Sequence, residues 1–561
     1  MMKRDLNRLK DETFDLVIVG AGIYGAACAW EAASRGLSVA LVERGDFGCR
    51  TSANSLKTIH GGLRYLQTLD LKRFLESVRE RKILMRIAPH LVHPLPVVMP
   101  AYGHLMKGPE ILWAGLLVND VLSFSRNFGM DPSRSIPPGR ILSKRSCVAC
   151  IPGIDHHRVT GCASWTDAQM YNSDRMLLAF IRSAAEAGAS AANYLHAEGL
   201  LRSGKSVEGI GVRDVFSGGR FPIRSRMVLD ASGAWITRWN REDGEQADQY
   251  YGKRSTAMNL VIERELLQHH AAGIMSRFRH VRKNGRTFKG SRILFLAPWR
   301  QFTIAGTFHR PYEGDPDDMK VTESEVQEAL SEINRAYPGA PIERREVTFV
   351  HKGFLPMEGI NAKSGEVLLT KHYRINDHGR TDGLQNYFSL AGVKYTTARD
   401  VAEKVVTLVL KKLGKSAGHS PTRSSFISGG DIHRFEPYLN QVMMSDAYRL
   451  SGRMLHHLVR NYGSDYPDIL KIIEENRDWA EPVNGSLEVL KAEIVHAVRC
   501  EMAHKLSDAV LRRTDLGSGK RPGRKALEEC ARIMAGELKW DEERVQSEIR
   551  DTEMLYPAQP S

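Results

Sequence analysis

The chain has 561 residues, of which 42% are hydrophobic and 26% charged, and its formal net charge is +13. A single hydrophobic core rarely grows beyond about 250–300 residues, so we expect more than one domain. The composition excludes a disordered or fibrous chain, and seven cysteines without framework spacing indicate a reducing compartment. The positive charge permits an anionic partner, but the dispersed basic residues and the lack of binding motifs argue against nucleic acid.

The sequence shows no targeting or membrane-spanning segment. Residues 1–10 are charged and lack the apolar core of a secretory signal, and the apolar run at residues 111–118 is too short to cross a bilayer. We therefore expect a cytoplasmic location. The segment 94–138, which mixes prolines with that apolar run, is the expected site of peripheral contact with the inner face of the cell membrane.

The first strongly patterned stretch is an apolar run that ends in a glycine-rich turn. Residues 16–19 indicate a buried parallel strand, followed by a small-residue helix that opens with Gly20, Gly22 and Gly25. The first glycine makes the tight turn, the second admits a pyrophosphate, and the third lets the helix pack closely on the strand. A second strand, residues 38–42, ends in Glu43, where an acid binds ribose hydroxyls. This pattern predicts a dinucleotide site, and the simpler alternative is a glycine-rich turn in an ordinary α/β domain.

The rest of the chain mixes helices and strands before it becomes helical. We expect helices over residues 71–87, 173–187, 322–336 and 398–413. Strands should dominate residues 189–228, with a hairpin at 217–219, and residues 254–307, whereas 139–166 is expected to be irregular. Cys147 and Cys150 form a single CxxC that indicates neither a redox motif nor a metal site.

A segment rich in Ser, Thr, Pro and Gly, residues 414–430, has the composition of a linker. The pattern beyond it is helical to the end of the chain. We therefore expect two domains, residues 1–425 and residues 426–561.

Separated motifs then match a known pattern: GAGIYG at 20–25, KTIHGGLRY at 57–65, LDASGAW at 229–235, GVKYTT at 392–397, HLVRNYGS at 457–464 and EMAHKLSDAVLRRT at 501–514. Together they resemble the FAD-dependent glycerol-3-phosphate dehydrogenases, which belong to the D-amino-acid-oxidase-like flavoproteins. The resemblance implies an α/β fold: a Rossmann-like FAD-binding domain with an interleaved antiparallel-sheet substrate domain, plus an all-α C-terminal domain. It also implies noncovalent FAD and oxidation of sn-glycerol 3-phosphate to dihydroxyacetone phosphate. The electrons would pass to a membrane quinone, although some relatives use oxygen.

The resemblance also suggests site residues. His60 is the first candidate base, because histidine titrates near neutrality, and His309 and His351 are alternatives. Arg64 would orient the substrate anion through paired hydrogen bonds. Lys394 would lie beside the pyrimidine end of the flavin, where the helix that starts near Thr396 adds its dipole. The expected cofactor contacts are Gly20, Gly22, Gly25, Glu43, Ser52, Ser55, Gly233, Lys394 and Thr396.

The sequence departs from the family at the substrate end. Leu355 stands where the family usually has an arginine, and Lys371 replaces a second one, while Lys352 and Lys371 would partly compensate. The family's Gly-Thr-Thr-Asp becomes residues 306–309, GTFH. An alternative substrate is therefore another anionic or amphiphilic alcohol or amine, in a more apolar pocket around Leu355, Phe308 and His309. A third hypothesis is a flavin-bearing regulatory or scaffold protein without turnover, and a homodimer is compatible with the sequence.

Overall fold

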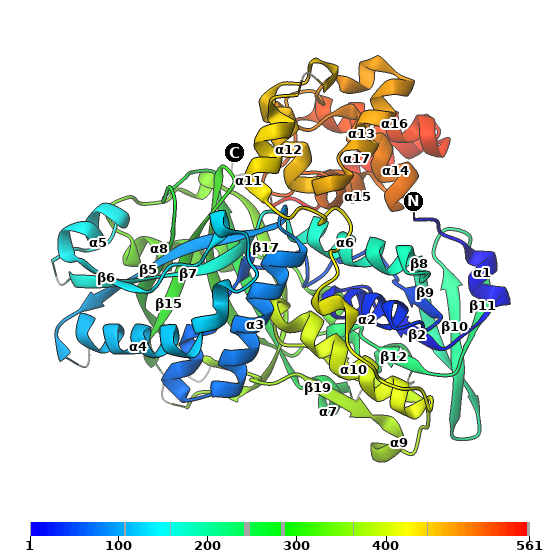
Figure 1. The fold of residues 1–561 in the computed structure, drawn as a ribbon, viewed down its shortest axis with the longest axis horizontal. Coiled ribbons are helices and arrows are strands. Elements are labelled where there is room, and N and C mark those ends of the chain that lie inside the picture. The colour runs from blue at the N-terminus through cyan, green and yellow to red at the C-terminus, as the bar shows by residue number, and fades with distance from the viewer. Residues whose placement is uncertain are drawn as a thin grey trace.

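The computed structural model describes residues 2–105, 108–157, 159–240, 247–281, 287–362, 364–445 and 447–557. Figure 1 shows a broad body built on sheets, with the C-terminal helices docked on one side of it.

The nucleotide-type sheet has six strands in the order β19-β20-β12-β2-β3-β8. They are β2 (Leu16–Val19), β3 (Val39–Val42), β8 (Ser190–Ala192), β12 (Val228–Asp230), β19 (Arg374–Asp377) and β20 (Tyr387–Ala391). Every residue of β2 and β3 is buried, because the sheet is covered on both faces. Helices α2 (Ile23–Ser34), α6 (Ser173–Glu186) and α10 (Ala398–Lys412) pack on one face.

The other face of this sheet is covered by a small four-stranded sheet with the order β1-β11-β10-β9. Its strands are β1 (Thr13–Phe14), β9 (Leu195–Ser203), β10 (Ser206–Asp214) and β11 (Arg220–Ser225). The predicted hairpin at 217–219 joins β10 to β11. The first core of the protein therefore has three layers, of helices, a mostly parallel sheet and an antiparallel sheet.

A ten-stranded sheet forms the second body, in the order β18-β17-β13-β16-β15-β14-β5-β7-β4, with β6 paired to β7. Its strands are β4 (Thr58–Ile59), β5 (Val92–Tyr102), β6 (Arg140–Ser143), β7 (Val159–Met170), β13 (Lys253–Ile262), β14 (Ala271–Val281), β15 (Thr287–Trp299), β16 (Phe302–Tyr312), β17 (Val347–Ile360) and β18 (Val367–Leu369). These strands come from two insertions, one between β3 and β8 and one between β12 and β20. The predicted interleaving of the two domains is confirmed.

Further helices surround this sheet and the first core: α1 (Leu6–Asp11), α3 (Leu71–Ile87), α4 (Pro109–Leu122), α5 (Lys144–Cys150), α7 (Ala247–Tyr251), α8 (Glu323–Ala336) and α9 (His378–Thr381). Helices α5 and α8 pack with the large sheet in one apolar cluster. A 3₁₀ helix, η1 (Leu63–Thr68), precedes α3 and contacts α4.

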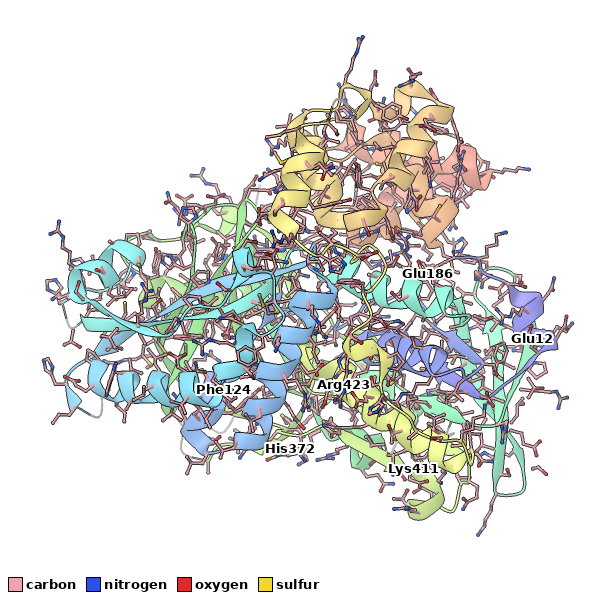
Figure 2. The ribbon with its side chains drawn as sticks, in the orientation of Figure 1. Glu12, Phe124, Glu186, His372, Lys411 and Arg423 are labelled. Atoms are coloured by element: carbon pink, nitrogen blue, oxygen red, sulfur yellow. The ribbon has the colours of Figure 1, made fainter. Side chains whose placement is uncertain are left out.

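The described chain after residue 430 is helical: α11 (Phe435–Met443), α12 (Gly452–Tyr462), α13 (Pro467–Glu475), α14 (Lys491–Glu501), α15 (Leu506–Asp508), α16 (Arg524–Leu538) and α17 (Glu542–Glu553). These helices enclose two apolar clusters of their own. The segment 414–430 that leads to them is tied to the first core. Arg423 donates to Glu403 at 2.9 Å, and Ser428 donates to Glu186 at 3.1 Å. Figure 2 labels Arg423 and Glu186.

The structure confirms the four predicted helices, with ends within a residue or so. The expectation that residues 139–166 are irregular is wrong, because β6, α5 and the start of β7 lie there. Prolines at 94, 96 and 100 concealed the partner strand β5. They share one parity, so their missing N–H groups point to one side of the strand, and the pairing with β7 persists on the other.

No helix of the described residues has the length and apolar character that a membrane crossing requires. No group of three or more His, Cys, Asp or Glu side chains in the described chain could hold a metal ion.

Candidate active site

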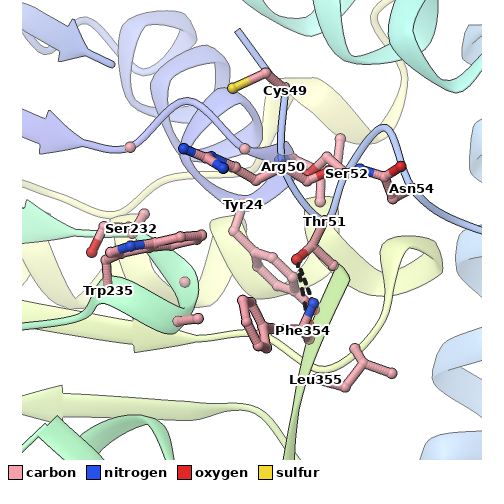
Figure 3. Close-up of a pocket in the computed structure, with 18 of the residues that line it drawn as sticks. Tyr24, Cys49, Arg50, Thr51, Ser52, Asn54, Ser232, Trp235, Phe354 and Leu355 are labelled. Atoms are coloured by element: carbon pink, nitrogen blue, oxygen red, sulfur yellow. Dashed lines mark hydrogen bonds between the residues drawn. The ribbon is translucent and has the colours of Figure 1, made fainter. Parts of the chain in front are cut away.

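A cavity of about 790 Å³ opens at the carboxyl ends of β2, β3, β12 and β20, where the two bodies meet. Its walls come from the glycine turn, the loop 44–55, β9, residues 231–235, the strands β13, β16 and β17, and residues 392–396. Figure 3 shows part of this wall, with the loop that carries Thr51 bonded to β17. The Phe354 N–H donates to Thr51 Oγ1 at 2.9 Å.

The glycines of the first turn occupy the positions that their predicted roles require. Gly20 has φ +97°, and a Cβ there would lie 2.7 Å from Ser232 Cα. A Cβ on Gly25 would overlap the Gly20 carbonyl oxygen, so only glycine lets α2 approach β2. Gly22 lines the cavity, and a Cβ on it would meet only the Ser52 hydroxyl, at 3.3 Å. The middle glycine therefore faces open space at the amino terminus of α2, as a pyrophosphate site requires.

Polar groups surround this end of α2. Ser52 Oγ accepts from the Ile23 N–H at 3.0 Å. Glu43, at the end of β3, accepts from the Ala21 N–H at 2.9 Å and from the Gly45 N–H at 3.0 Å. Glu43 and Ser52 both line the cavity, as do Ser55 and Gly233. The predicted adenosine and pyrophosphate contacts thus share one wall.

An aromatic residue bounds the same part of the cavity. Trp235 contacts two guanidinium groups, with Arg44 4.8 Å and Arg50 5.4 Å from the ring centroid. Its indole N–H donates to Asp317 at 3.0 Å. Arg44 and Arg50 lie on the loop that follows β3, so this cationic wall belongs to the nucleotide end.

Lys394 lies at the opposite end of the cavity. Its ammonium donates to Ser77 Oγ at 2.9 Å and lies 4.7 Å from the centre of the Tyr65 ring. Burial, together with the positive charge of Arg73, lowers the pKa of Lys394 to about 8. Thr396 lines the cavity in the short turn η10 (Tyr395–Thr397), and α10 begins directly after it. The predicted cation and helix dipole therefore face the cavity together.

Two of the three candidate histidines line the cavity. Burial and the positive charge of Lys394 lower the pKa of His60 to about 4. Burial and the charges of Arg292 and Arg64 lower the pKa of His309 to about 4. Both imidazoles are therefore neutral at pH 7, and the expectation that His60 titrates near neutrality is wrong, because burial and nearby cations disfavour its charged form. His351 lies between Trp299 and Phe349, outside the cavity wall.

The other substrate-end residues divide between the cavity and its surroundings. Leu355 lines the cavity, but Arg64 and Lys371 do not and are exposed to solvent. Lys352 is committed to Glu325 at 2.8 Å, so the expected compensation by this lysine is wrong. Phe308 is buried in the apolar cluster behind the sheet, so its expected place in the pocket is also wrong. Strand alternation explains the position of Phe308, because it faces away from its neighbours Thr307 and His309.

The polar lining residues that the sequence analysis did not assign to the site include Lys57, Asn259 and Thr307. Thr307 Oγ1 donates to Asn259 Oδ1 at 2.8 Å, so the two side chains form one polar part of the wall. Lys57 Nζ donates to Ala53 O at 2.6 Å and Ser173 Oγ at 2.7 Å, and burial lowers its pKa to about 8. A polar Asn259 inside an apolar strand run was the available signal for this wall.

Buried hydrogen bonds to Asp167 fix the loop that carries His60. The Gly61 N–H donates to Asp167 Oδ1 at 2.6 Å, and Arg81 donates to the same oxygen at 3.1 Å. The Trp165 indole N–H donates to Asp167 Oδ2 at 3.0 Å. These buried bonds fix the backbone beside His60, so its imidazole has a defined place on the cavity wall.

The cavity as a whole fits FAD. A glycine turn lies at one end, and Glu43 follows the second strand there. Lys394 and the start of α10 lie at the other end. The family model described as "FAD dependent oxidoreductase" matches residues 15–392. The model described as "C-terminal domain of alpha-glycerophosphate oxidase" matches residues 420–545.

Similar proteins extend over nearly the whole chain. The glycerol-3-phosphate dehydrogenase of Synechocystis is 29% identical over 98% of this chain and 97% of its own length. The human mitochondrial glycerol-3-phosphate dehydrogenase is 29% identical over 96% of this chain and 72% of its own length. The glycerol-3-phosphate dehydrogenase of Bacillus halodurans, solved with FAD, has a TM-score of 0.71 at 20% identity and covers 98% of this chain and 95% of that one.

The two glycines at the head of α2 predict different defects. Gly22→Val should leave a folded but colourless protein, because its side chain occupies only the space that the pyrophosphate needs. Gly25→Ala should instead lower the stability of the fold, because its Cβ meets the Gly20 carbonyl. Flavin content and the thermal midpoint of the flavin-free protein separate the two. A yellow Gly22→Val protein would contradict the assignment of this site.

Proposed function

The chain belongs to the family of FAD dependent oxidoreductases, and from that premise we propose that it oxidises sn-glycerol 3-phosphate to dihydroxyacetone phosphate. The observation that carries the proposal is the reacting end of the cavity, where a neutral His60 and a cationic Lys394 lie on the same wall. The names of the full-length relatives support the substrate. Bound FAD supplies the chemistry of hydride acceptance.

His60 takes the role of base in this proposal. An imidazole nitrogen of His60 accepts the proton of the substrate hydroxyl, which is possible at neutral pH because the ring is uncharged there. His309 is the alternative base, and its Nδ1 is buried without a hydrogen-bond partner among the described residues. Asn259 and Thr307 border His309 and can donate to or accept from a substrate oxygen.

The phosphate is placed at the mouth of the cavity. Arg64 is exposed on η1, yet it is near enough to His309 to lower its pKa. The neighbour of Lys371, His372, lies 3.9 Å from Asp70 at the start of α3, so Lys371 borders the same part of the molecule. Arg64 and Lys371 therefore offer two cations at one rim, and the guanidinium is the better match for a phosphate.

A second candidate function keeps the flavin chemistry but takes a different anionic alcohol or amine. The observation that favours it is Leu355, which lines the cavity where a cation would hold a phosphate. The arginines of the described lining are Arg44, Arg50 and Arg238. Arg44 and Arg50 border Trp235 at the nucleotide end, and Arg238 pairs with Asp315. In the first proposal, binding of the substrate phosphate thus depends on Arg64 and Lys371 at the rim.

We also propose peripheral membrane contact, with a quinone as electron acceptor. An apolar ridge is exposed on segments after His60 that contact one another, formed by Leu69, Leu71, Leu75, Trp113, Leu117, Val121, Phe124 and Phe128. It runs over η1, α3, α4 and the turn after α4, where Phe124 is 72% exposed and is labelled in Figure 2. An apolar ridge with basic neighbours suits the interface of an anionic bilayer, and it would bring the mouth to an apolar acceptor.

We also propose a domain division, a cellular location and an oligomeric state. The division of the chain at residues 425 and 426 is supported by the linker and by the two apolar clusters that the C-terminal helices form, while Ile427 and Met502 pack into the cluster of the first core. A cytoplasmic site on the inner membrane face is supported by seven free cysteines. A homodimer remains compatible with the chain.

The substrate is tested by anaerobic bleaching of the flavin with sn-glycerol 3-phosphate beside a panel of hydroxy acids and amino acids. Bleaching by glycerol 3-phosphate is expected. Arg64→Lys should retain flavin but lower kcat/KM on the order of 10- to 100-fold, because a charged hydrogen bond is worth about 1.5–3 kcal/mol. Leu355→Arg should raise kcat/KM for glycerol 3-phosphate.

The matched control is Arg310→Lys, because Arg310 is an exposed arginine that pairs with Glu328 outside the cavity. This variant should change neither the flavin content nor kcat/KM. If Leu355→Arg abolishes activity on another donor while glycerol 3-phosphate stays inert, the second candidate function is correct. If no donor bleaches the flavin, the protein is a flavin-bearing scaffold.

The pH profile of kcat/KM reports the base in the free enzyme. Because the pKa of His60 is about 4, the base form persists as pH falls through 6.5, and the acid limb should lie below about pH 5. His60→Asn should lower kcat on the order of 10²- to 10⁴-fold with flavin retained, whereas His309→Asn should mainly affect KM. An acid limb near pH 6.5 that His60→Asn leaves in place would reject His60 as the base.

Membrane contact is tested by sedimentation with vesicles. Wild-type protein should bind anionic vesicles at low salt and release at high salt, and Trp113→Asp with Phe124→Asp should remove the binding. Met444→Asp is the control, because Met444 is 86% exposed on the C-terminal helical part, away from the ridge. Equal binding of wild type to neutral vesicles, or equal loss with Met444→Asp, would argue against the ridge.

A further inference from the structure

The C-terminal motif at residues 501–514 is not used by the chemistry described above, yet the structure buries its arginines against the first core. Arg513 donates from both terminal nitrogens to the two oxygens of Asp46, each at 2.7 Å. Arg512 donates from Nε to Asp46 Oδ2 at 2.5 Å. The side chains of Asp46 and Arg513 are both 1% exposed.

Asp46 belongs to the loop 44–55 that forms part of the cavity wall. Two residues further along, the Gly48 N–H donates to the carbonyl oxygen of Ala21 in the glycine turn at 3.1 Å. Ser52 then reaches the Ile23 N–H, and Thr51 accepts from Phe354. The loop is thus fixed at one end by the C-terminal arginines and in its middle by the pyrophosphate turn and β17.

Residues 193 and 194 also join the loop 44–55 to the C-terminal helical part. The Asn193 amide donates to Asp46 Oδ1 at 2.9 Å, and the Tyr194 N–H donates to the Gly45 carbonyl at 2.9 Å. The Tyr194 hydroxyl donates to Asp508 Oδ1 at 2.7 Å, on the helix that leads to the arginines. Asp508 in turn pairs with Arg512 at 2.7 Å. The strand end before β9 and the C-terminal helices therefore hold the loop from both sides.

The charges of this cluster depend on one another. Burial raises the pKa of the Asp46 carboxyl, but Arg513 and Arg512 more than offset this effect and hold it below its usual range. Asp46 is therefore ionised although it is buried, and the two arginines compensate its charge. If the C-terminal part moves away, the loop loses both compensating charges and their hydrogen bonds, and has to rearrange.

We propose that Arg512 and Arg513 are positioning residues for FAD: through Asp46 they hold the loop 44–55 against the pyrophosphate turn, so this one contact of the C-terminal helical part sets the affinity for the cofactor. The coupling is reciprocal, and bound FAD stabilises the docked C-terminal part in return. The inference concerns cofactor binding alone and holds whichever substrate the protein oxidises.

The test compares two isosteric changes at buried interdomain ion pairs. Asp46→Asn removes the carboxylate charge with which the loop 44–55 binds Arg512 and Arg513. Glu501→Gln removes the charge that α6 meets through Arg175 at 2.6 Å and Arg182 at 3.3 Å, and no residue of α6 lines the cavity. Glu501 is fully buried and paired with two arginines, as Asp46 is, so the two variants are matched.

The FAD dissociation constant is measured from the fluorescence of flavin released on serial dilution of the full-length holoprotein, together with the thermal midpoint of the flavin-free protein. Both variants should lower that midpoint. Asp46→Asn should weaken FAD binding at least 10-fold, whereas Glu501→Gln should change it less than about 2-fold. An unchanged constant in Asp46→Asn, or equal weakening in Glu501→Gln, would overturn the proposal, since the arginines would then only support the fold.

Arg512→Gln keeps the test decisive if Asp46→Asn does not fold. Arg512 is 11% exposed, and Arg513 remains to pair with Asp46 in this variant. FAD binding should weaken at least 3-fold. A constant equal to that of wild type in a folded Arg512→Gln protein would overturn the proposal.

Discussion

The structure depends on one close approach of backbone to backbone, at the turn between β2 and α2. Gly20 meets the backbone at Ser232, and Gly25 meets the carbonyl of Gly20, at separations that leave no room for a Cβ. This contact joins the first two strands of the parallel sheet to β12, which arrives some two hundred residues later in the chain. It also fixes the amino terminus of α2 toward the cavity. The fold and the cofactor site therefore share one steric condition.

Buried charge is organised around the same turn. On one side, Asp46 and the C-terminal arginines compensate each other behind the loop that covers the pyrophosphate position. On the other, burial keeps the imidazoles of His60 and His309 neutral and lowers the pKa of Lys57 and Lys394 to about 8. The proposed reacting end thus combines uncharged imidazoles with lysines that hold their protons less tightly than usual, which suits the proposed removal of a proton from a hydroxyl group.

The substrate end is built by strand alternation, and the mouth is built by surface helices. On β16, Thr307 and His309 face the cavity, while Phe308 supports the apolar cluster behind the sheet. The cations that remain for an anion lie at the rim, where Arg64 shares η1 and its surroundings with the apolar ridge. Substrate and electron acceptor would therefore approach from one side of the molecule. This arrangement links the chemistry of the pocket to the proposed membrane contact.

Local pattern by itself determined much of this protein. The apolar strand, the three glycines and Glu43 specified the nucleotide turn, because strand, turn and helix propensities act over a few neighbouring residues. The helices at 71–87 and 398–413 followed from period and end signals for the same reason. Only the tertiary structure decided which distant side chains meet. Asn259 joins Thr307, Lys352 turns to Glu325, and Asp46 meets Arg513 across more than four hundred residues. Such pairings depend on sheet register, strand parity and domain docking, which are set by long-range packing and leave no periodic signal in the sequence.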